Sequence, residues 1–490
     1  MIWPLPIVVS VALLLLRSFQ PVPCEAHSGG CPQKDQMKKM PYIAANGFSK
    51  MLAPKRSKAA CLVALLLGAS LLRGEIKVLR NFTLIDGTGR PPLTGAAMIL
   101  DSGRIVWVGS VTQLQAPAGA QTVDLTGKFV MPGIINLHGH LGNTLDLTQD
   151  ARFFTRENVE KNLKTYASYG VTAMLSMGTD QDPIFQIRDR QRAGRPSMTR
   201  VFTAGQGFIF RGGYGGIAGV NQGVASAAEV ESAVAEQARK KVDIIKLWMD
   251  DELGKFPKMP YPIAKAIIDD AHRRHLRVTA HIFYLQDAKQ LTDYGVDSLA
   301  HSVRDKPGDP ALFESMKTHG TWQMAATLSR EASMYIYASL PPFLSDPFFT
   351  RGVSPAALKT LQSPEYRKTI SSGPHFKEYP DFLETARKNL KTLADAGVKY
   401  GFGTDTGPPG RFPGYFEHWE MELMVEAGLT PMQVIAAATR NAAEFLGAKD
   451  LGTLERSKWA DLMVLDRNPL DDIRNTRTIH AVYIAGNRVP

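Results

Sequence analysis

The strongest constraint on the fold is a regular alternation of strand-like and helix-like segments through the middle of the chain, residues 131–449. Amphipathic patterns such as ESAVAEQARKK and PIAKAIIDDAHRRH lie between most of the apolar runs there. The eight runs of strand length are GIINLHGH, VTAMLSMG, TRVFTAG, VDIIKLWM, LRVTAHI, DSLAHSV, TWQMAATL and VKYGFGTD. Continuous apolar runs are typical of parallel strands that are buried on both faces. Eight such units in roughly 250 or more residues predict an α/β fold built on a (β/α)8 barrel.

Short β-rich stretches flank this region on both sides. IKVLRNFTLID, AAMILDSGRIVWVGS and QTVDLTGKFVM precede it, and DLMVLDRNP and IHAVYIAGNRV follow it, with glycine-containing turns between them. We therefore expect residues 75–130 and 450–490 to pair into one small β-sandwich lobe beside a barrel domain of residues 131–449. Residues 330–380 form a longer insertion than a βα unit needs, and we expect them to cap the mouth of the barrel.

The formal charge of +10 is concentrated in the first 74 residues. They hold nine Lys and Arg against Glu25 and Asp35, so the other 416 residues carry only +3. A body so close to neutral gives no support for a nucleic-acid partner, and we expect a small-molecule substrate; homo-oligomerisation stays open. All three cysteines also precede residue 75. Any metal in the remaining chain must therefore be held by His, Asp, Glu or Lys chemistry.

Residues 1–74 contain two short apolar runs, PIVVSVALLLL and AACLVALLLGASLL. The second run follows Met51 and the basic stretch PKRSK, which together give the n-region and h-region of a secretory signal. We expect Met51 to be the true start, with export to the periplasm or the medium and no stable membrane insertion after processing. The alternatives are a membrane anchor and a spurious extension on a cytoplasmic enzyme. An exported chain should begin near residues 70–75 when the protein from its native host is sequenced from its N-terminus.

Polar side chains stand at the ends of five of the predicted strands. They are His138, His140, Lys246, His281, His301 and Asp405. Catalytic groups of such barrels collect at the carboxyl ends of the strands. Each residue alone has an ordinary structural explanation; Lys246, for example, would be a core lysine paired with Asp250 or Asp251. Six candidate ligands at one end of the barrel together predict a metal site.

The motifs PGIINLHGH, IIKLW, AH, LAH and FGTD, in this order, resemble the amidohydrolase superfamily. The resemblance is greatest to its imidazolonepropionase-like and Xaa-Pro dipeptidase-like members. It extends from about residue 75 to the C-terminus through TLIDGTG, DLTGKFVMPG, EAGLTPMQVIAAATRNAAEFLG and WADLMVLDRNPL. It implies two divalent metal ions, and His and carboxylate ligands without sulfur favour Zn²⁺.

The resemblance also implies a role for each candidate ligand. The more buried ion would be held by His138, His140 and Asp405, and the more exposed ion by His281 and His301. Lys246 resembles the lysine that reacts with CO2 to give a carbamate bridging both ions, which favours hydrolysis over deamination. The implied activity is hydrolysis of a non-peptide or dipeptide-type amide by a metal-activated hydroxide, with Asp405 as the general base and acid.

Five further residues near the predicted strand ends are candidates for substrate binding. They are Arg211, Tyr214, Trp248, Tyr284 and His418. Arg211 would hold a substrate carboxylate through its planar guanidinium group. The alternative for Arg211 is a solvated loop arginine, and the alternative for the other candidates is an ordinary structural role. Two alternatives stay open for the whole chain: a lactonase- or phosphotriesterase-like hydrolase on the same two-metal site, and a non-catalytic binding barrel. Activity on a panel of substrates would distinguish the first alternative from an amidohydrolase, and the metal content of the purified protein would test the second.

Overall fold

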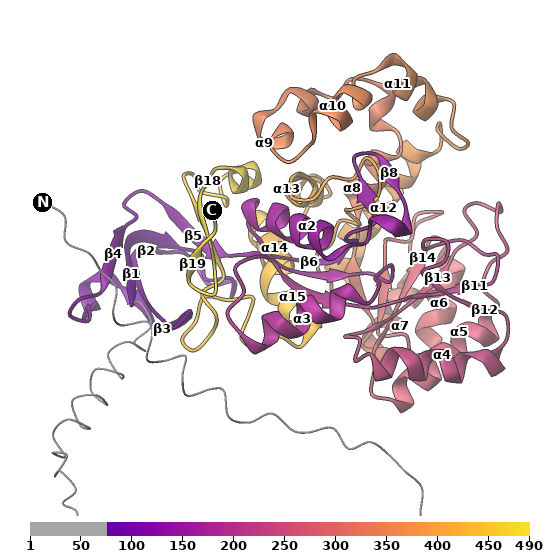
Figure 1. The fold of residues 1–490 in the computed structure, drawn as a ribbon, viewed down its shortest axis with the longest axis horizontal. Coiled ribbons are helices and arrows are strands. Elements are labelled where there is room, and N and C mark those ends of the chain that lie inside the picture. Colours follow the sequence, from indigo (N-terminus) through magenta and orange to yellow (C-terminus); the bar gives the residue numbers. More distant parts are fainter. Residues whose placement is uncertain (1–75) are drawn as a thin grey trace, which may run out of the picture. The chain divides into compact units, whose positions relative to one another are not determined.

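The computed structural model describes residues 76–490, which lie within one compact unit of the chain (Figure 1). The predicted signal segment and Met51 lie outside the described residues. The strands are β1 (Lys77–Leu84), β2 (Leu93–Asp101), β3 (Arg104–Ser110), β4 (Gln121–Asp124), β5 (Phe129–Pro132), β6 (Ile134–Gly139), β7 (Thr144–Leu145), β8 (Thr148–Gln149), β9 (Val171–Ser176), β10 (Arg200–Thr203), β11 (Phe208–Phe210), β12 (Gln222–Val224), β13 (Ile245–Met249), β14 (Val278–Ile282), β15 (Ser298–Ala300), β16 (Trp322–Ala325), β17 (Leu462–Leu465), β18 (Ile479–Ile484) and β19 (Asn487–Arg488). The α-helices are α2 (Arg156–Ser168), α3 (Pro183–Ala193), α4 (Ala227–Arg239), α5 (Tyr261–Arg273), α6 (Leu285–Asp293), α7 (Pro310–His319), α8 (Leu328–Ser333), α9 (Pro347–Thr350), α10 (Pro355–Leu361), α11 (Pro364–Ser371), α12 (Tyr379–Asp395), α13 (Tyr415–Glu426), α14 (Pro431–Ala436) and α15 (Ala442–Leu446).

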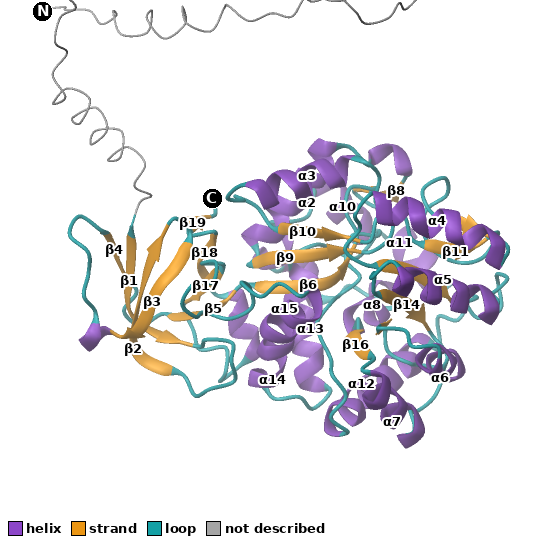
Figure 2. Cartoon of the chain, turned by 90° about the horizontal axis from the view of Figure 1, so that it is seen from below, coloured by secondary structure: helices purple, strands orange, loops and turns teal. Residues whose placement is uncertain are grey.

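Both ends of the described chain meet in one sheet of eight strands (Figure 2). Its order is β19-β18-β17-β5-β1-β2-β3, and β4 pairs with β1. The antiparallel pair β5–β17 joins the N-terminal strands to the C-terminal ones, with Val130 opposite Val464. The pairing does not divide this sheet into two layers, so the sandwich arrangement and the predicted domain boundaries stay predictions.

The central region has a (β/α)8-barrel-type α/β fold. Parallel strands alternate with helices and form a three-stranded sheet, β10-β9-β6, and a six-stranded sheet, β12-β11-β13-β14-β15-β16 (Figure 2). The ladders do not close into one continuous sheet. Strands β6, β13 and β14 are buried at every position, which is why their sequences read as unbroken apolar runs. Helix α5 buries one face, including Ile263 and Ile267, against the core that β13 and β14 share.

The eighth predicted strand, 398–405, lies between β16 and β6 and forms one isolated bridge to each side. Backbone hydrogen bonds join it to both strands, such as Gly401 N to Gln323 O at 3.0 Å and Leu137 N to Phe402 O at 2.8 Å. Tyr400 pairs with Gln323, and Thr406 pairs with Gly139. Two glycines allow this close approach, because a Cβ atom at Gly401 would lie 2.7 Å from a backbone oxygen and one at Gly403 would lie 2.7 Å from the His138 nitrogen. Glycine weakens a regular strand while permitting tight backbone packing. The segment therefore occupies the predicted position without a regular ladder.

The predicted insertion after β16 forms α8 to α11 and packs as an aromatic cluster. Tyr337, Phe343 and Phe349 contact α13 through Tyr415 and Phe416. In Figure 1, α9, α10 and α11 lie together on the side of α13. No helix among residues 76–490 has the length and apolar character needed to cross a bilayer.

Candidate active site

The six predicted ligand residues meet at the carboxyl ends of the barrel strands. His138 lies in β6 with His140 directly after it, Lys246 in β13, His281 in β14, His301 directly after β15, and Asp405 at the end of the 398–405 segment. All six are more than nine-tenths buried. Parallel strands present their carboxyl ends at one edge, so residues far apart in the sequence become neighbours there. The structure thus brings together all six residues.

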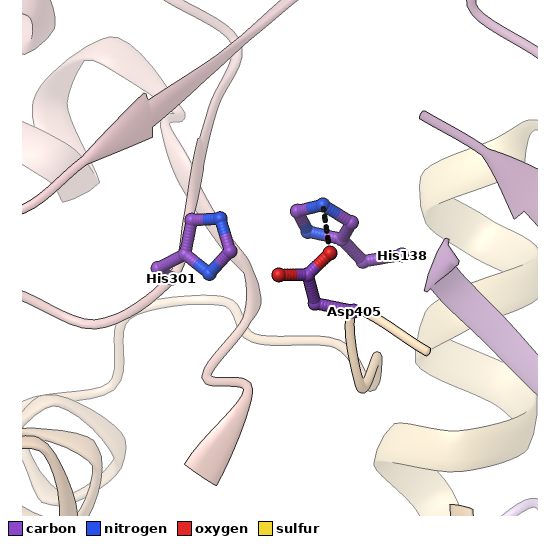
Figure 3. Close-up of side chains that lie close together, drawn as sticks. All are labelled: His138, His301 and Asp405. Carbon is purple, nitrogen blue, oxygen red and sulfur yellow. Dashed lines mark ion pairs between the residues drawn. The ribbon is translucent and has the colours of Figure 1, made fainter. Parts of the chain in front are cut away.

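The imidazoles form one continuous cluster around Asp405. Ring centroids lie 4.2 Å apart for His281 and His301, and 4.7 Å apart for His138 and His301. Asp405 Oδ1 lies 2.9 Å from His140 Nε2 and 3.6 Å from His138 Nε2. Figure 3 shows His138, His301 and Asp405 facing a common point, and one ligand atom from each lies within 4.8 Å of the others. This spacing is close to that of ligands around one ion with bonds of about 2.0–2.2 Å.

Hydroxyl groups behind the cluster orient two of the histidines. His140 Nδ1 shares a hydrogen bond of 3.0 Å with Thr179 Oγ1, and His301 Nδ1 shares one of 2.7 Å with Thr327 Oγ1. Such bonds fix the ring orientation and turn Nε2 toward the centre of the cluster, where Nε2 of His140 meets Asp405 Oδ1. His138 Nδ1 is buried and has no hydrogen-bond partner among the described residues.

Three residues at this edge adopt left-handed backbone conformations. The φ angles are 69° for His301, 57° for Thr327 and 57° for Asp405. Residues other than glycine rarely occupy this region, and β-branched threonine least of all. Strained backbone is found where surrounding structure must aim a side chain, which is typical of functional sites.

Burial decides the charge state of the cluster. It lowers the pKa of His138 and His301 well below the ordinary value, and it lowers the pKa of His281 to about 4. Burial alone would raise the pKa of Asp405, but the Arg411 guanidinium and the hydrogen bond from His140 hold it well below its usual range. At neutral pH the site therefore presents neutral imidazoles around an ionised carboxylate, the forms that bind metal ions.

Lys246 lies at the floor of the site. Its side chain is fully buried, and its Nζ makes no hydrogen bond to any described residue. The alternative that Lys246 pairs with Asp250 or Asp251 is therefore not what the structure shows. Burial lowers the pKa of the Lys246 amine to about 7. The Trp248 ring lies beside it, with its centroid 5.2 Å from Nζ.

The cluster opens into a cavity of about 460 Å³, large enough for a small organic substrate. Two of the five predicted substrate residues, Tyr214 and Trp248, line this cavity. Tyr214 also stacks edge-on against His281 with ring centroids 5.4 Å apart. The insertion 330–380 contributes none of the described lining residues, so the structure does not place it as a cap over this cavity.

The other three substrate candidates are engaged elsewhere. Arg211 is 61% exposed and donates to Glu229 at 2.6 Å, outside the cavity lining. Tyr284 donates to Asp251 at 2.8 Å. His418 is buried on α13, where it bonds to Thr476 and to a backbone carbonyl. Side chains on long loops and helix ends find local partners that strand order alone does not reveal.

Sequence reasoning missed three residues at the site. Arg411 lines the cavity and donates to Asp405, and Arg330 lies 3.7 Å from the same carboxylate. Asp250 Oδ2 lies 2.7 Å from His281 Nε2, so binding of an ion through that nitrogen requires this hydrogen bond to be exchanged. Arg411 follows Asp405 by six residues, and its position just beyond a predicted strand end could have identified it as a candidate site residue.

Comparison with known proteins agrees with the site geometry. The sequence profile of the Amidohydrolase family matches residues 129–489. Ochratoxinase from Aspergillus niger is 24% identical over 444 residues, which cover 83% of this chain and 84% of that protein. Imidazolonepropionase from Streptomyces griseus subsp. griseus is 23% identical over 398 residues, 78% of this chain and 89% of that protein. The crystal structure of a Xaa-Pro dipeptidase with bound methionine in the active site matches with a TM-score of 0.66 and 21% identity, over 84% of this chain and 99% of that one.

The family match covers the barrel and the C-terminal strands, so it includes every predicted ligand residue. The motif-based prediction is therefore confirmed at the level of the amidohydrolase superfamily. Proteins of this family act on small molecules. With its buried His and Asp cluster and its relatives among enzymes of this kind, the chain belongs to the amidohydrolase family and is a hydrolase of carbon–nitrogen bonds.

Proposed function

We propose that this protein is a metal-dependent amidohydrolase that cleaves a non-peptide or dipeptide-type amide bond. The observation that carries the proposal is a buried cluster of four neutral imidazoles, three of which lie around the ionised carboxylate of Asp405, at the base of a substrate-sized cavity. The family relatives named ochratoxinase and imidazolonepropionase support amide hydrolysis over cleavage of a lactone or phosphotriester.

The residues of the cluster fit divalent metal ions. Its ligand atoms are closely spaced, its imidazoles are uncharged, and His138 Nδ1 and Lys246 Nζ are buried polar atoms without hydrogen-bond partners among the described residues. In this proposal His138, His140 and Asp405 would hold one ion, and His281 and His301 would hold a second; a sulfur-free donor set favours Zn²⁺. When bound, such ions supply a Lewis acid for the amide carbonyl and lower the pKa of water.

Lys246 supports the two-ion arrangement. An ammonium group would repel both ions, whereas the uncharged amine adds to CO2 and releases a proton, giving a carbamate whose single negative charge is shared by two oxygens. The pKa of about 7 that burial gives this amine means that much of it is uncharged at neutral pH. We therefore propose that Lys246 would serve as a carbamate ligand of both ions.

Asp405 is the proton carrier in this proposal. Its Oδ1 faces His140 and its Oδ2 faces Arg411, so the carboxylate is held at the base of the cavity. Its low pKa keeps it ionised at neutral pH, ready to accept the proton of the attacking water. The same group then protonates the leaving nitrogen, which allows the tetrahedral adduct to break at the C–N bond.

Metal content and activity together test the proposal. Purified protein should contain about two divalent ions per chain, and it should hydrolyse members of a panel of N-acyl amino acids and dipeptides more efficiently than lactones or phosphotriesters. His138→Ala should lower the metal content and reduce kcat/KM by at least about 100-fold, because each ion depends on its imidazoles. His375→Ala is the matched control, since His375 is 40% exposed and its one ion pair among residues 76–490 is with Glu378. Full activity in metal-free His138→Ala protein would contradict the proposal.

A further inference from the structure

A chain of buried ion pairs runs outward from Asp405, on the side away from the histidines. Arg411 donates to Asp405 Oδ2, and Arg330 Nε lies 3.7 Å from that oxygen. Arg330 also donates to Glu331 Oε1 at 2.6 Å, and Arg304 Nε lies 3.0 Å from the same atom. None of these five side chains is more than 17% exposed. The chain of pairs therefore belongs to the interior wall of the site.

The guanidinium groups of this chain share their carboxylates. Asp405 lies beside Arg411 and Arg330, and Glu331 lies beside Arg330 and Arg304, on which Asp250 also acts. Burying a charge is costly unless a counter-charge lies nearby. Arg411 thus shares its one carboxylate partner with Arg330, beside the cavity that receives the substrate.

Arg411 is the member of the chain that faces this cavity. It lines the cavity together with Asp405 and the cluster histidines. Among residues 76–490, the Arg411 guanidinium donates hydrogen bonds to one side chain, Asp405, although it carries five N–H donors in a planar fork. Arg330 lies beside the same carboxylate oxygen, so Asp405 keeps a cationic neighbour when Arg411 turns its other donors toward a ligand. Lys255 also lines the cavity, but it is 60% exposed and paired with Glu252.

We propose that Arg411 binds the carboxylate of the substrate, so that the enzyme acts on amides whose leaving amino acid carries a free α-carboxylate, such as N-acyl amino acids and dipeptides. The inference rests on the proposed function, because it places Asp405 beside the leaving nitrogen. An α-carboxylate is separated from that nitrogen by one carbon. Arg411 is bonded to the proton carrier itself, and its fork suits bidentate recognition of a carboxylate.

The opposite walls of the cavity suit an apolar side chain or acyl group. Tyr214, Trp248 and Phe256 line it, and the rings of Tyr214 and Phe256 lie 6.2 Å apart between centroids. Aromatic walls with one well-placed charged group are typical of pockets that orient a small amphiphilic ligand. The cavity therefore matches an amino acid derivative with an apolar part and one negative charge.

Two amides that differ only in the carboxylate test this inference. N-acetyl-L-phenylalanine and N-acetylphenethylamine share the acyl group, the scissile bond and the ring. We expect the parent enzyme to prefer the carboxylate by about 100-fold in kcat/KM, and Arg411→Gln to lose about 10- to 100-fold on that substrate, which corresponds to one charge-assisted hydrogen-bond pair. Arg411→Lys should retain part of the preference, because it keeps the charge without the fork. The matched control is Arg211→Gln, which removes the same charge outside the cavity and should change kcat/KM by less than about 2-fold.

A binding experiment separates this inference from the proposed function. Titration calorimetry with 3-phenylpropanoate and 3-phenylpropan-1-ol requires no turnover, and the acid should bind the parent enzyme at least about 10-fold more tightly than the alcohol. That difference should disappear in Arg411→Gln while metal content and melting temperature stay at the parental values. Equal binding of acid and alcohol, or an undiminished difference in Arg411→Gln, would overturn the role of Arg411 whatever the activity. If the acid binds as expected but neither amide is hydrolysed, the carboxylate subsite stands and the proposed function is what fails for these substrates.

Discussion

Lys246 shows how the surroundings of one side chain determine its chemistry. The amine is fully enclosed, finds no hydrogen-bond partner among the described residues, and has a pKa near neutrality. Gly178 and Gly207 make room for its stem, since a Cβ atom at Gly178 would lie 2.9 Å from Lys246 Cγ and one at Gly207 would lie 3.1 Å from it. A lysine that served only to fill the core would be expected to pair with a carboxylate. Its isolation instead favours covalent use of the amine.

Substitution of Lys246 tests this reading. Lys246→Ala should reduce kcat/KM by at least about 100-fold, because it removes a proposed ligand of both ions. Short carboxylates such as formate or acetate should restore part of the activity by standing in for the carbamate. Lys246→Arg should not restore activity, because a guanidinium stays protonated and does not take up CO2. Metal reconstitution without CO2 and bicarbonate should also yield less active enzyme; a Lys246→Arg variant as active as the parent would require the carbamate to be withdrawn.

At the scale of elements, helix α13 holds together the two segments that supply His138 and Asp405. Glu417 of α13 accepts hydrogen bonds from Asn136 Nδ2 at 2.7 Å and from Thr404 and Thr406 Oγ1, each at 2.8 Å. Asn136 lies in β6 two residues before His138, and the two threonines flank Asp405. This network adds to the backbone hydrogen bonds between β6 and the 398–405 segment, such as that from Asp405 N to His138 O at 2.7 Å, so we infer that Glu417 is a positioning residue.

Glu417→Gln should weaken this junction while leaving the fold intact. One oxygen that now accepts from three side chains is exchanged for an amide with fewer acceptor sites, so we expect the free energy of unfolding to fall by about 1–3 kcal/mol. The affinity for the added metal ion should fall as well, which a purely structural role would not require. Chemical denaturation and metal titration measure the two effects. Glu422→Gln on the same helix is the control, because Glu422 pairs with Arg477 away from the site; an equal loss of metal affinity there would remove the positioning role.

At the scale of the whole described unit, a largely buried ion pair connects the terminal sheet to the barrel. Arg200 at the start of β10 donates to Asp461, just before β17, through Nε at 2.6 Å and Nη2 at 3.2 Å. Asp461 also accepts from the backbone nitrogen of Ala485 at 2.7 Å. The side chains are 12% and 5% exposed, so the bidentate geometry is protected from solvent.

Asp461→Asn should therefore destabilise the protein without affecting the active site. Loss of the charge at a largely buried bidentate pair is expected to cost about 1–3 kcal/mol of unfolding free energy. Metal content and kcat/KM should stay close to the parental values, because the pair lies at the opposite end of β10 from the catalytic edge. Asp466→Asn is the control: Asp466 pairs with Lys128 but is 47% exposed, and such surface pairs contribute about 0–1 kcal/mol. Equal melting temperatures for the two variants would show that the buried pair adds no stability.

Much of the fold and of the metal cluster could be predicted from local patterns. Apolar runs buried on both faces identified the strands, and seven of the eight predicted runs overlap regular strands of the barrel. The eighth, 398–405, lacks a regular ladder, since Gly401 and Gly403 admit close packing there. The strand ends then located His138, His281 and Asp405, because parallel strands carry their carboxyl ends to a common edge.

Side chains outside the strands could not be assigned in this way. Arg211 and Arg411 both lie in glycine-containing loops at the same edge, yet only Arg411 reaches the cavity, while Arg211 is held at the surface by Glu229. The sequence by itself determined which residues end buried strands, since that depends on short-range periodicity and composition. Only the tertiary structure decided which loop arginine faces Asp405, and that no side chain of residues 76–490 accepts a hydrogen bond from Lys246. Loop paths and partners depend on contacts between residues distant in the chain.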